Sequence, residues 1–477
     1  MVVKFCQFQP LAPGLGKGYN ATHMDIDQKY QETLDYLYSY IDFSLQKASR
    51  YSPDRFDLGR MRDFMASLGD PQSEYRVIHI AGTKGKGSVA ALCANALTKS
   101  GLRSGLYTSP HLQDYAERIQ VNGVPIPHEN LIDLVDEMKP NIADSPEITT
   151  FEITTALALL YFSRLNVDVA VLEVGLGGRL DATNVCDPDV TVITSISYDH
   201  TYLLGETLAE IAGEKAGIVK PEIPLVVAPQ VTEARQAILR IAEQRSAPVF
   251  EVGKDYLFRP SDKSLSGQGI TVWSAISSEH DSSPVELSIP LLGDHQLVNA
   301  ATAFATLMVA KEKGIEVSIN GIKAGFQSVH WPGRFELLRH DPALIIDSAH
   351  NRDSARKLNK VLEDYFPGQK VVLVFGASED KDISGMLEEL KPALQKIVMT
   401  KSTHPRAADP EDLVAIARQI NCQAVASTSV EAAMMEAERL ADGQRIILVT
   451  GSIFVAAAAR SVWMAAESEE ELASIGK

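Results

Sequence analysis

The stretch RVIHIAGTKGKGSVAALCANALTKSG, residues 76–101, decides the fold. It predicts a short apolar strand, a glycine-rich loop and then a helix. Gly82, Gly85 and Gly87 let backbone N–H groups come close to phosphate oxygens, and the N-terminus of a helix attracts negative charge. Lys86 adds a full positive charge. The stretch therefore predicts a phosphate-binding loop, although its spacing departs from the usual G-x-x-x-x-G-K-[ST] pattern.

Apolar segments further along the chain continue this pattern. Residues 167–174 and 189–196 are apolar runs, which is typical of parallel strands buried on both faces. An expected helix at 206–217 and an expected strand at 224–229 follow. Because strands and helices alternate, we predict a parallel sheet joined by crossover helices.

Three other segments of this first unit have a different character. Residues 1–25 are rich in Gly, Pro and polar side chains and predict a loose extension, after which apolar side chains at helical spacing from Ile26 to Ile41 predict an amphipathic helix. Polar turns between short β-rich pieces at 255–290 predict a small antiparallel addition at the sheet edge. A helix is expected at 295–314.

A second α/β unit is predicted after WPGR, residues 331–334, because Pro and Gly punctuate the chain there. The expected strands of this unit cover residues 343–347, 370–376, 396–400 and 445–451. We therefore predict an α/β protein with two domains that meet at a cleft. Residues 1–330 would form a P-loop ATPase domain with a mainly parallel sheet, and residues 331–477 a smaller Rossmann-like α/β domain.

The overall composition excludes some classes of partner. The 477 residues carry a formal net charge of -17, which repels nucleic acid and anionic membranes. An anionic substrate must then be held by a few local cations or metal ions. The 4 cysteines are scattered without a C-x-x-C pair, the N-terminus lacks a signal-peptide pattern, and no apolar run is long enough to span a bilayer. We expect a cytoplasmic protein.

Four side chains are candidates for binding a divalent cation or for catalysis. They are Ser109, Glu152, Glu173 and His200. Mg²⁺ prefers oxygen ligands and needs only one or two from the protein when phosphates supply the others. Ser109, Glu152 and His200 each have a structural alternative as a turn, exposed-helix or helix-capping residue. Glu173 ends an apolar strand before a glycine-rich loop, where ligands bind in open α/β sheets, so a functional role is favoured.

An ordered set of motifs between residues 55 and 455 resembles the folylpolyglutamate synthase and dihydrofolate synthase family, which belongs to the wider Mur-ligase-like superfamily. The motifs are HIAGTKGKGS, YTSPHL, TTFEITT, EVGLGGRLDATN, DHTYLLGETLAEIAGEKAGIVK, GDHQLVNA, WPGR, DSAHN and TGSIFVAA. The likeness covers nearly the whole chain, and the order of the motifs carries it rather than any single one.

The resemblance implies a set of site residues. ATP would be bound by Gly85, Lys86, Gly87, Ser88, Asn299, Arg334 and Asp347, and Mg²⁺ by Ser109, Glu152 and His200. The incoming glutamate would lie near His350 and Ser452, and the folate in the first domain near the loops that follow Ser109 and Glu152. Lys215 matches a lysine that the family can carry as a carbamate. With Glu173 included, the expected catalytic residues are Lys86, Glu152, Glu173, His200, Lys215 and His350.

The implied chemistry is ATP-dependent amide formation. The γ-phosphate of ATP would first convert a carboxylate into an acyl phosphate, which the amine of L-glutamate would then attack. Carboxylate and triphosphate repel each other, so Lys86, Arg334 and Mg²⁺ must neutralise their charge. The expected acceptors are a folate and also dihydropteroate, and the expected assembly is a monomer.

The sequence departs from the family pattern at three positions and leaves two alternatives open. Lys84 stands where many bacterial members have Asn, Ser348 where Gly is usual, and Arg352 where Pro often follows. One alternative is a Mur-type ligase of cell-wall precursors, although the roughly 76 residues before the first strand do not predict the separate UDP-binding domain usual there. The other is an inactive module that binds a nucleotide or a folate.

Overall fold

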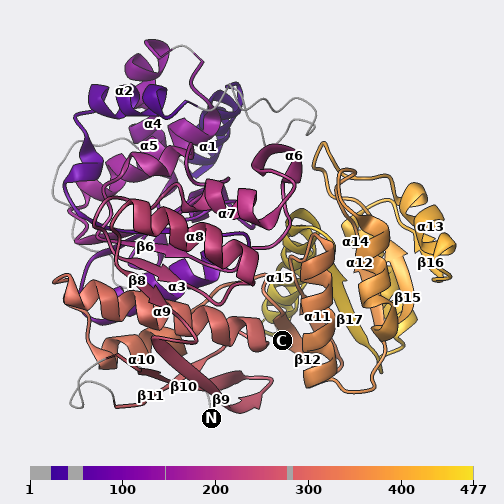
Figure 1. The fold of residues 1–477 in the computed structure, drawn as a ribbon. Helices are drawn as coiled ribbons and strands as arrows, with labels where there is room; N and C mark the ends of the chain where they lie inside the picture. The colour runs from indigo at the N-terminus through magenta and orange to yellow at the C-terminus, as the bar shows by residue number, and fades with distance from the viewer. Residues whose placement is uncertain (1–22, 41–56, 146, 277–282, 476–477) are drawn as a thin grey trace.

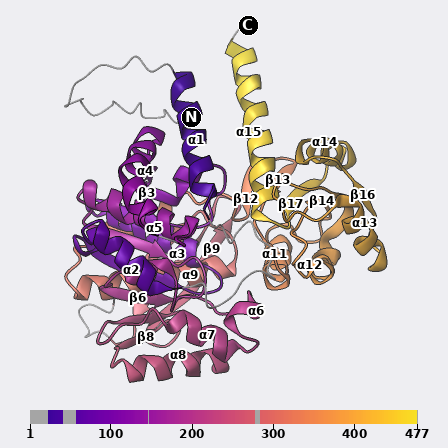
Figure 2. The same ribbon diagram turned by 90° about the horizontal axis from the view of Figure 1, so that it is seen from above.

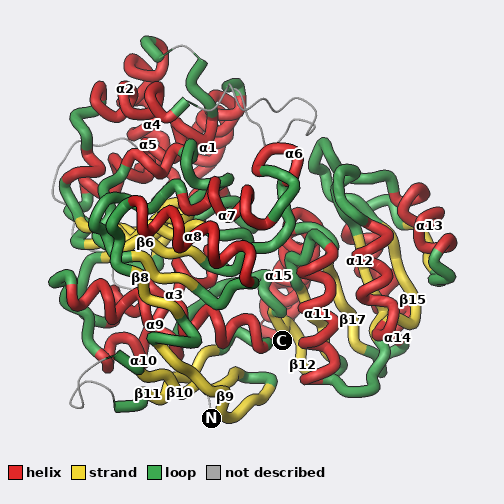
Figure 3. The backbone as a smooth tube through the Cα atoms, viewed as in Figure 1, coloured by secondary structure: helices red, strands yellow, loops and turns green. Residues whose placement is uncertain are grey.

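The computed structural model describes residues 23–40, 57–145, 147–276 and 283–475 (Figure 1). Two large sheets stand side by side, and each is covered by helices on both faces (Figure 3). Within the described residues, no strand is shared between them, and the segment at 331–334 lies between the two. This arrangement confirms the predicted α/β fold with mainly parallel sheets.

The first sheet has the strand order β4-β3-β2-β5-β1-β6-β7-β8 in the described part of the chain. Its strands are β1 (Arg76–Ala81), β2 (Ser104–Tyr107), β3 (Ile119–Val121), β4 (Val124–Pro125), β5 (Val169–Glu173), β6 (Val190–Ile193), β7 (Leu225–Val227) and β8 (Val249–Glu251). All neighbours from β2 to β8 in this order are parallel, whereas β3 and β4 add an antiparallel hairpin at one edge.

Helices cover both faces of this sheet because its central strands are apolar on both sides. Ile78 and Ile80 of β1 pack on one face, and Val77 packs on the other. The first face carries α3 (Lys86–Lys99), α9 (Asp294–Glu312) and α10 (Ile319–Gln327). The other carries α1 (His23–Tyr38), α2 (Leu58–Ser67), α4 (His128–Ala143) and α5 (Thr150–Arg164). Near β6 and β7 lie α6 (Thr201–Leu204), α7 (Leu208–Ala216) and α8 (Thr232–Gln244).

The antiparallel segment forms a sheet of its own. It consists of β9 (Tyr256–Ser264), β10 (Gly267–Ser274) and β11 (Val285–Ile289), in the order β11-β10-β9. The prediction of antiparallel strands is therefore confirmed, but their expected place at the edge of the parallel sheet is wrong. The apolar side of this small sheet, including Ile270 and Leu287, packs with α9 and α10 instead, where its apolar side chains are removed from water.

The second large sheet has the order β12-β13-β17-β14-β15-β16. Its strands are β12 (Glu336–His340), β13 (Ala343–Ile346), β14 (Val371–Phe375), β15 (Leu394–Met399), β16 (Ala424–Ala426) and β17 (Ile446–Thr450). The pair β12–β13 is antiparallel and the others are parallel. One face carries α11 (Arg352–Tyr365), α12 (Ile383–Leu390) and α13 (Pro410–Gln419), and the other α14 (Val430–Ala441) and α15 (Ile453–Ile475).

Most expected elements are present, with shifted ends. The four strands expected in the second unit correspond to β13, β14, β15 and β17, whereas the short edge strands β12 and β16 were not predicted. The expected N-terminal helix corresponds to α1, but Ile41 and the extension at 1–22 lie outside the described residues. The last turns of α15 extend beyond both sheets (Figure 2). None of the described helices combines the length and the apolar character needed to cross a bilayer.

Candidate functional site

The glycine loop between β1 and α3 packs tightly against two other segments. Gly85, at the N-terminus of α3, has a φ of 91°, and a Cβ atom there would lie 2.3 Å from Oδ1 of Asn299 on α9. A Cβ atom on Gly87 would lie 2.9 Å from Trp331. A side chain at either position would force Asn299 or Trp331 to move, and the positive φ at Gly85 also favours glycine. The structure thus brings the predicted phosphate loop, the helix terminus that favours anions and Asn299 together.

A buried carboxylate faces this loop. Glu173, the last residue of β5, is 6% exposed, and its Oε2 accepts a hydrogen bond of 3.3 Å from the backbone N of Ser109. Nζ of Lys86 lies 4.0 Å from its Oε1. Burial raises the pKa of Glu173, and the charge of Lys86 opposes this shift. Ser88 is also buried, in the first turn of α3. Glu173, Ser109 and Lys86 therefore form one charged corner, and Ser88 follows in the first turn of α3.

Glu152 lies in a different environment. It is the third residue of α5, and its Oε2 accepts hydrogen bonds from N and Oγ1 of Thr149, at 2.8 and 2.7 Å. Arg60 of α2 forms an ion pair with the same carboxylate at 2.9 Å. No hydrogen bond or ion pair among the described residues joins Glu152 to Ser109 or His200. The structure thus places Glu173, and not Glu152, beside Ser109.

The donor set fits a divalent cation that a nucleotide helps to bind. Across the described part of the chain, no three His, Cys, Asp or Glu side chains gather as a complete metal site. Mg²⁺ does not require one, because phosphates and water supply most of its ligands. Glu173 is buried and its nearest described cation is the ammonium of Lys86 at 4.0 Å, so a carboxylate beside Ser109 is available to a hard cation.

His200 and Lys215 both favour the neutral form. Burial lowers the pKa of His200 to about 4, and the positive charges of Lys381 and Lys215 add to this shift. A neutral imidazole can bind a metal ion. Burial lowers the pKa of Lys215 on α7 to about 7, with help from the charge of Lys86. Lys215 is therefore partly an uncharged amine at neutral pH, the form that reacts with CO₂.

The segment between the domains brings Arg334 next to Asp347. The carboxylate of Asp347 accepts hydrogen bonds from the backbone N of Phe335 and of Ala349, both at 2.8 Å. Burial raises the pKa of Asp347, and Arg334 opposes this shift as it does for Glu173. Arg334 therefore lies close enough to influence both carboxylates, one in each domain.

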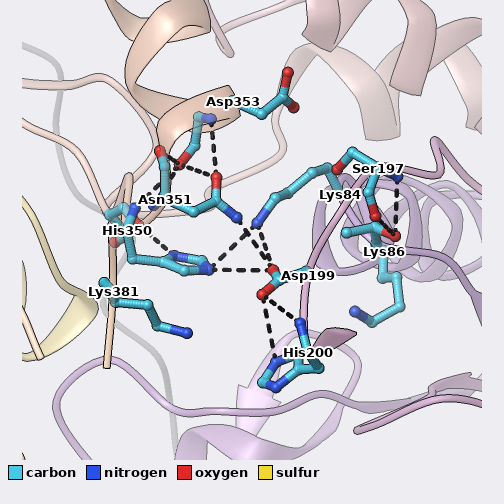
Figure 4. Close-up of polar contacts among 12 residues, drawn as sticks. Lys84, Lys86, Ser197, Asp199, His200, His350, Asn351, Asp353 and Lys381 are labelled. Carbon is cyan, nitrogen blue, oxygen red and sulfur yellow. Dashed lines mark hydrogen bonds and ion pairs between the residues drawn. The ribbon is translucent and has the colours of Figure 1, made fainter. Parts of the chain in front are cut away.

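Asp199 joins the two domains, and sequence reasoning missed it. Its Oδ2 accepts hydrogen bonds from Nζ of Lys84 at 2.9 Å and from Nδ2 of Asn351 at 3.2 Å (Figure 4). Burial opposes ionisation, but the hydrogen bond and charge of Lys84 help to hold the pKa of Asp199 well below its usual range. The available signal was its place in SYDH after strand β6, at the edge of the sheet where ligands bind.

His350 reaches the same cluster from the second domain. Its Nδ1 lies 3.0 Å from the backbone oxygen of Ser348, which can only accept, so Nδ1 carries the proton in the neutral ring. The lone pair on Nε2 then faces Nζ of Lys84 at 3.3 Å. The charge of Lys84, together with burial, lowers the pKa of His350. A neutral histidine therefore points at the glycine loop across the cleft.

Ser452 lies in the second domain beside a small hollow. Its Oγ accepts a hydrogen bond from the backbone N of Val455 at 3.1 Å, which caps the first turn of α15. The hollow is also lined by Ser378, His404 and Phe454, and the rings of the last two stack at 4.0 Å. The two predicted glutamate contacts, Ser452 and His350, thus lie on neighbouring loops of the second domain and have different bonding partners.

A cavity of about 460 Å³ opens next to the loop that follows Ser109. The first domain contributes that loop, α3 and the β3–β4 hairpin to its walls, and the second domain contributes Ile453 and Arg460 of α15. Arg334 and Trp331 also line it. The cavity is large enough for a drug-sized molecule. Of its two arginines, Arg460 is ion-paired with Glu336, so Arg334 is the cation that suits an anionic organic ligand.

The two departures in the second domain leave the site intact. Ser348 is not among the residues with positive φ, so this position does not require glycine. Its side chain points toward Gly333, where an added Cβ would lie 3.0 Å from Oγ of Ser348. Arg352 begins α11 and forms ion pairs with Glu388 and Glu389 of α12.

Comparison with known proteins agrees with this geometry. Residues 80–307 match the Mur ligase middle domain, and residues 333–453 match the glutamate ligase domain of Mur ligases. A Bacillus subtilis protein named dihydrofolate synthase/folylpolyglutamate synthase is 34% identical over 89% of this chain and 97% of its own length. A Haloferax volcanii relative, named as a probable bifunctional folylpolyglutamate synthase/dihydropteroate synthase, is 36% identical over 91% of this chain, which spans only 50% of that protein.

Solved structures give the same result. A Mycobacterium tuberculosis folylpolyglutamate synthase complexed with ADP superposes with a TM-score of 0.83 at 33% identity, covering 92% of this chain and 99% of the other. Escherichia coli FolC in complex with DHPP and ADP superposes with a TM-score of 0.80 at 32% identity, covering 92% and 98%. These relatives disfavour the alternative of a cell-wall ligase. The chain therefore belongs to the folylpolyglutamate synthase and dihydrofolate synthase family of the Mur ligase superfamily.

Proposed function

We propose that this protein is an ATP-dependent ligase that adds L-glutamate to a folate, and also to dihydropteroate, through an acyl phosphate. The observation that carries the proposal is the corner formed by Lys86, Glu173 and Ser109. His350 of the second domain lies 3.3 Å from Lys84 of the same glycine loop (Figure 4). This arrangement can hold a triphosphate on one side and present an amine from the other.

The residues of the first domain would bind and neutralise the nucleotide. Backbone N–H groups at Gly85–Ser88 and the ammonium of Lys86 would hold the phosphates, with Asn299 against the loop. Arg334, which lies near Glu173 and Asp347, would bring a second cation from the segment between the domains. Removal of one such group typically lowers the rate by about 10²–10³.

Mg²⁺ would be held by Glu173, Ser109 and Ser88, with His200 and Lys215 on the far side. When bound, the ion would polarise the phosphoryl oxygens and offset their charge. A carbamate on Lys215 would replace a cation by an anion beside His200 and add an oxygen ligand. Glu152, predicted as a ligand, would instead hold the N-terminus of α5 in place through Thr149 and Arg60.

The acceptor would occupy the cavity of about 460 Å³ beside the loop after Ser109. This placement agrees with the expected folate site near that loop. Arg334 would attract the carboxylates of a folate, whereas Arg460 is ion-paired with Glu336 at 3.0 Å and would contribute mainly to the shape of the wall. The incoming glutamate would approach from the side of His350 and Ser452, where the neutral ring of His350 adds no charge to repel an ammonium group.

The test is an assay of ADP release with ATP, Mg²⁺ and glutamate, offering tetrahydrofolate or dihydropteroate as acceptor. We expect ADP and a product one glutamate heavier with each, identified by mass spectrometry. Release only with a UDP-muramyl acceptor would contradict the proposal. Release with tetrahydrofolate alone would restrict the protein to polyglutamylation. The cytoplasmic location and the monomeric state stay predictions, for cell fractionation and gel filtration to test.

A further inference from the structure

Asp199 is the point at which three side chains from two domains meet. It follows β6 in the first domain, and its side chain is only 12% exposed. Lys84, from the glycine loop, lies 2.9 Å from Oδ2 and is 16% exposed. Asn351, at the start of α11 in the second domain, donates to the same oxygen at 3.2 Å. A largely buried carboxylate thus binds both the phosphate loop and the opposite domain (Figure 4).

The orientation of the Asn351 amide is fixed by its other bonds. Its Oδ1 accepts hydrogen bonds from the backbone N and from Oγ of Ser354, at 3.0 and 2.8 Å, and so caps α11. The NH₂ group must then face outward, and it donates to Asp199. Aspartate would cap the helix equally well. Unlike aspartate, asparagine can cap α11 and donate across the cleft at the same time.

The two lysines of the glycine loop have different environments. Lys86 faces the carboxylate of Glu173 in its own domain at 4.0 Å. Lys84 lies between Asp199 of its own domain and Nε2 of His350 in the other, at 2.9 and 3.3 Å. Lys84 therefore already has its charge matched, and it contacts the histidine expected near the incoming amino acid.

We propose that Asp199 is a positioning residue, which through Lys84 and Asn351 holds the second domain, and with it His350, over the phosphate loop. Lys86 then serves the nucleotide, whereas Lys84 serves the placement of the second domain. The kinetic part of the test rests on the proposed function, but the distance between the domains does not.

Other contacts between the domains lie away from this cluster. Gln113 donates to Ser461 of α15 at 2.8 Å, and Tyr365 of α11 donates to Gln268 of β10 at 3.2 Å. Loss of the Asp199 contacts should therefore loosen the cleft on one side and leave the domains attached. The expected signature is a broader range of distances between the domains, without unfolding.

The test exchanges the side chains of Asp199 and Asn351. Asn351→Asp keeps the cap of α11 but places a carboxylate against Asp199. We expect KM for glutamate to rise about tenfold, with the affinity for ADP, measured directly by calorimetry, changed less than about threefold. The double variant Asp199→Asn with Asn351→Asp restores a donor and an acceptor in reversed order. It should return KM to within about threefold of the wild type.

The distance between the domains gives an independent readout. Spin labels at the exposed positions Gln236 on α8 and Gln419 on α13, with Cys6 and Cys422 replaced by Ser, allow pulsed EPR on the whole protein. Asn351→Asp should broaden the distance distribution, and the double variant should narrow it again. Asp409→Asn, which changes a helix cap on α13 at the outer edge of the second domain, is the matched control and should change neither the distances nor KM.

Two results would overturn the inference. A double variant no better than Asn351→Asp in both readouts would mean that the two residues do not act on each other. An unchanged distance distribution in Asn351→Asp would mean that the contact does not position the second domain. If the wild-type protein made no glutamylated product, the proposed function would fail, whereas the EPR comparison would still decide the role of Asp199.

Discussion

The charged and titratable side chains near the strand ends of the two sheets differ in how exposed they are. At the end of β5 in the first sheet, the side chain of Glu173 is 8% exposed, and Lys215 on helix α7 is also buried, so the protonation of both depends on their immediate neighbours. At the edge of the second sheet, the side chain of His350 is 41% exposed and reaches across to the other domain. Buried side chains keep fixed positions because packing holds them, whereas an exposed side chain such as that of His350 depends on its contacts with the other domain. The first domain therefore offers a preformed corner, and the second completes it.

The largest effect expected in the preformed corner is that of Lys86→Ala. Removal of the ammonium leaves the phosphates and Glu173 without their nearest charge partner, so turnover should fall by about 10²–10³ or more. Lys99→Ala, in the last turn of the same helix, is the control and should keep the wild-type rate. Steady-state ADP release measures both. Similar activity in the two variants would mean that phosphate binds elsewhere.

Substitution of Glu173 and of Glu152 should have different effects, because Glu173 belongs to the corner and Glu152 holds the N-terminus of α5. Glu173→Gln should lower kcat by about 10² and raise the Mg²⁺ concentration needed for half activity. Glu152→Gln should instead lower the free energy of unfolding by about 1–3 kcal/mol, because Arg60 loses its charged partner. Magnesium titrations and urea unfolding separate the two effects. A shifted magnesium requirement in Glu152→Gln alone would restore Glu152 as the ligand.

The protonation state of the buried Lys215 can be tested through the reaction of its neutral amine with CO₂. Only the neutral amine reacts with CO₂, and the pKa of about 7 makes this form scarce below neutral pH and dominant above it. ¹³C NMR with labelled bicarbonate should show a carbamate signal that grows from pH 6 to pH 8 and is absent in Lys215→Ala. Short carboxylates should partly restore the lost activity of Lys215→Ala. A near-wild-type rate without added carboxylate would remove Lys215 from the mechanism.

The smallest effect is expected at Ser348, on the second sheet. Its hydroxyl is buried without a hydrogen-bond partner among the described residues, and its backbone does not require glycine. In Ser348→Gly, loss of that hydroxyl and the greater freedom of glycine in the unfolded chain offset each other to within about 1 kcal/mol. ADP affinity should change less than about threefold. A much tighter ADP complex would show that the side chain crowds the nucleotide.

The sequence by itself determined the fold and the phosphate loop. Runs of apolar residues such as 167–174 and 370–376 are typical of strands buried in a parallel sheet. The glycines between β1 and α3 let the backbone of the loop come close to a phosphate group. Both signals are local, because hydrophobic patterning and φ act over a few residues. Glu173 is recognisable from the sequence as a functional residue for a related reason. It ends an apolar strand at the side of the sheet where ligands bind in open α/β folds.

Only the tertiary structure decided which polar side chains meet. The resemblance implied Glu152 as a metal ligand, but in the structure Arg60, 92 residues away, pairs with Glu152, whereas Glu173 lies beside Ser109. Asp199 and Asn351 are 152 residues apart, and nothing local indicates that an amide from one domain binds a carboxylate in the other. The sequence gives the charge and the hydrogen-bond donors and acceptors of each side chain. Which side chain it bonds to depends on chain segments that folding brings together.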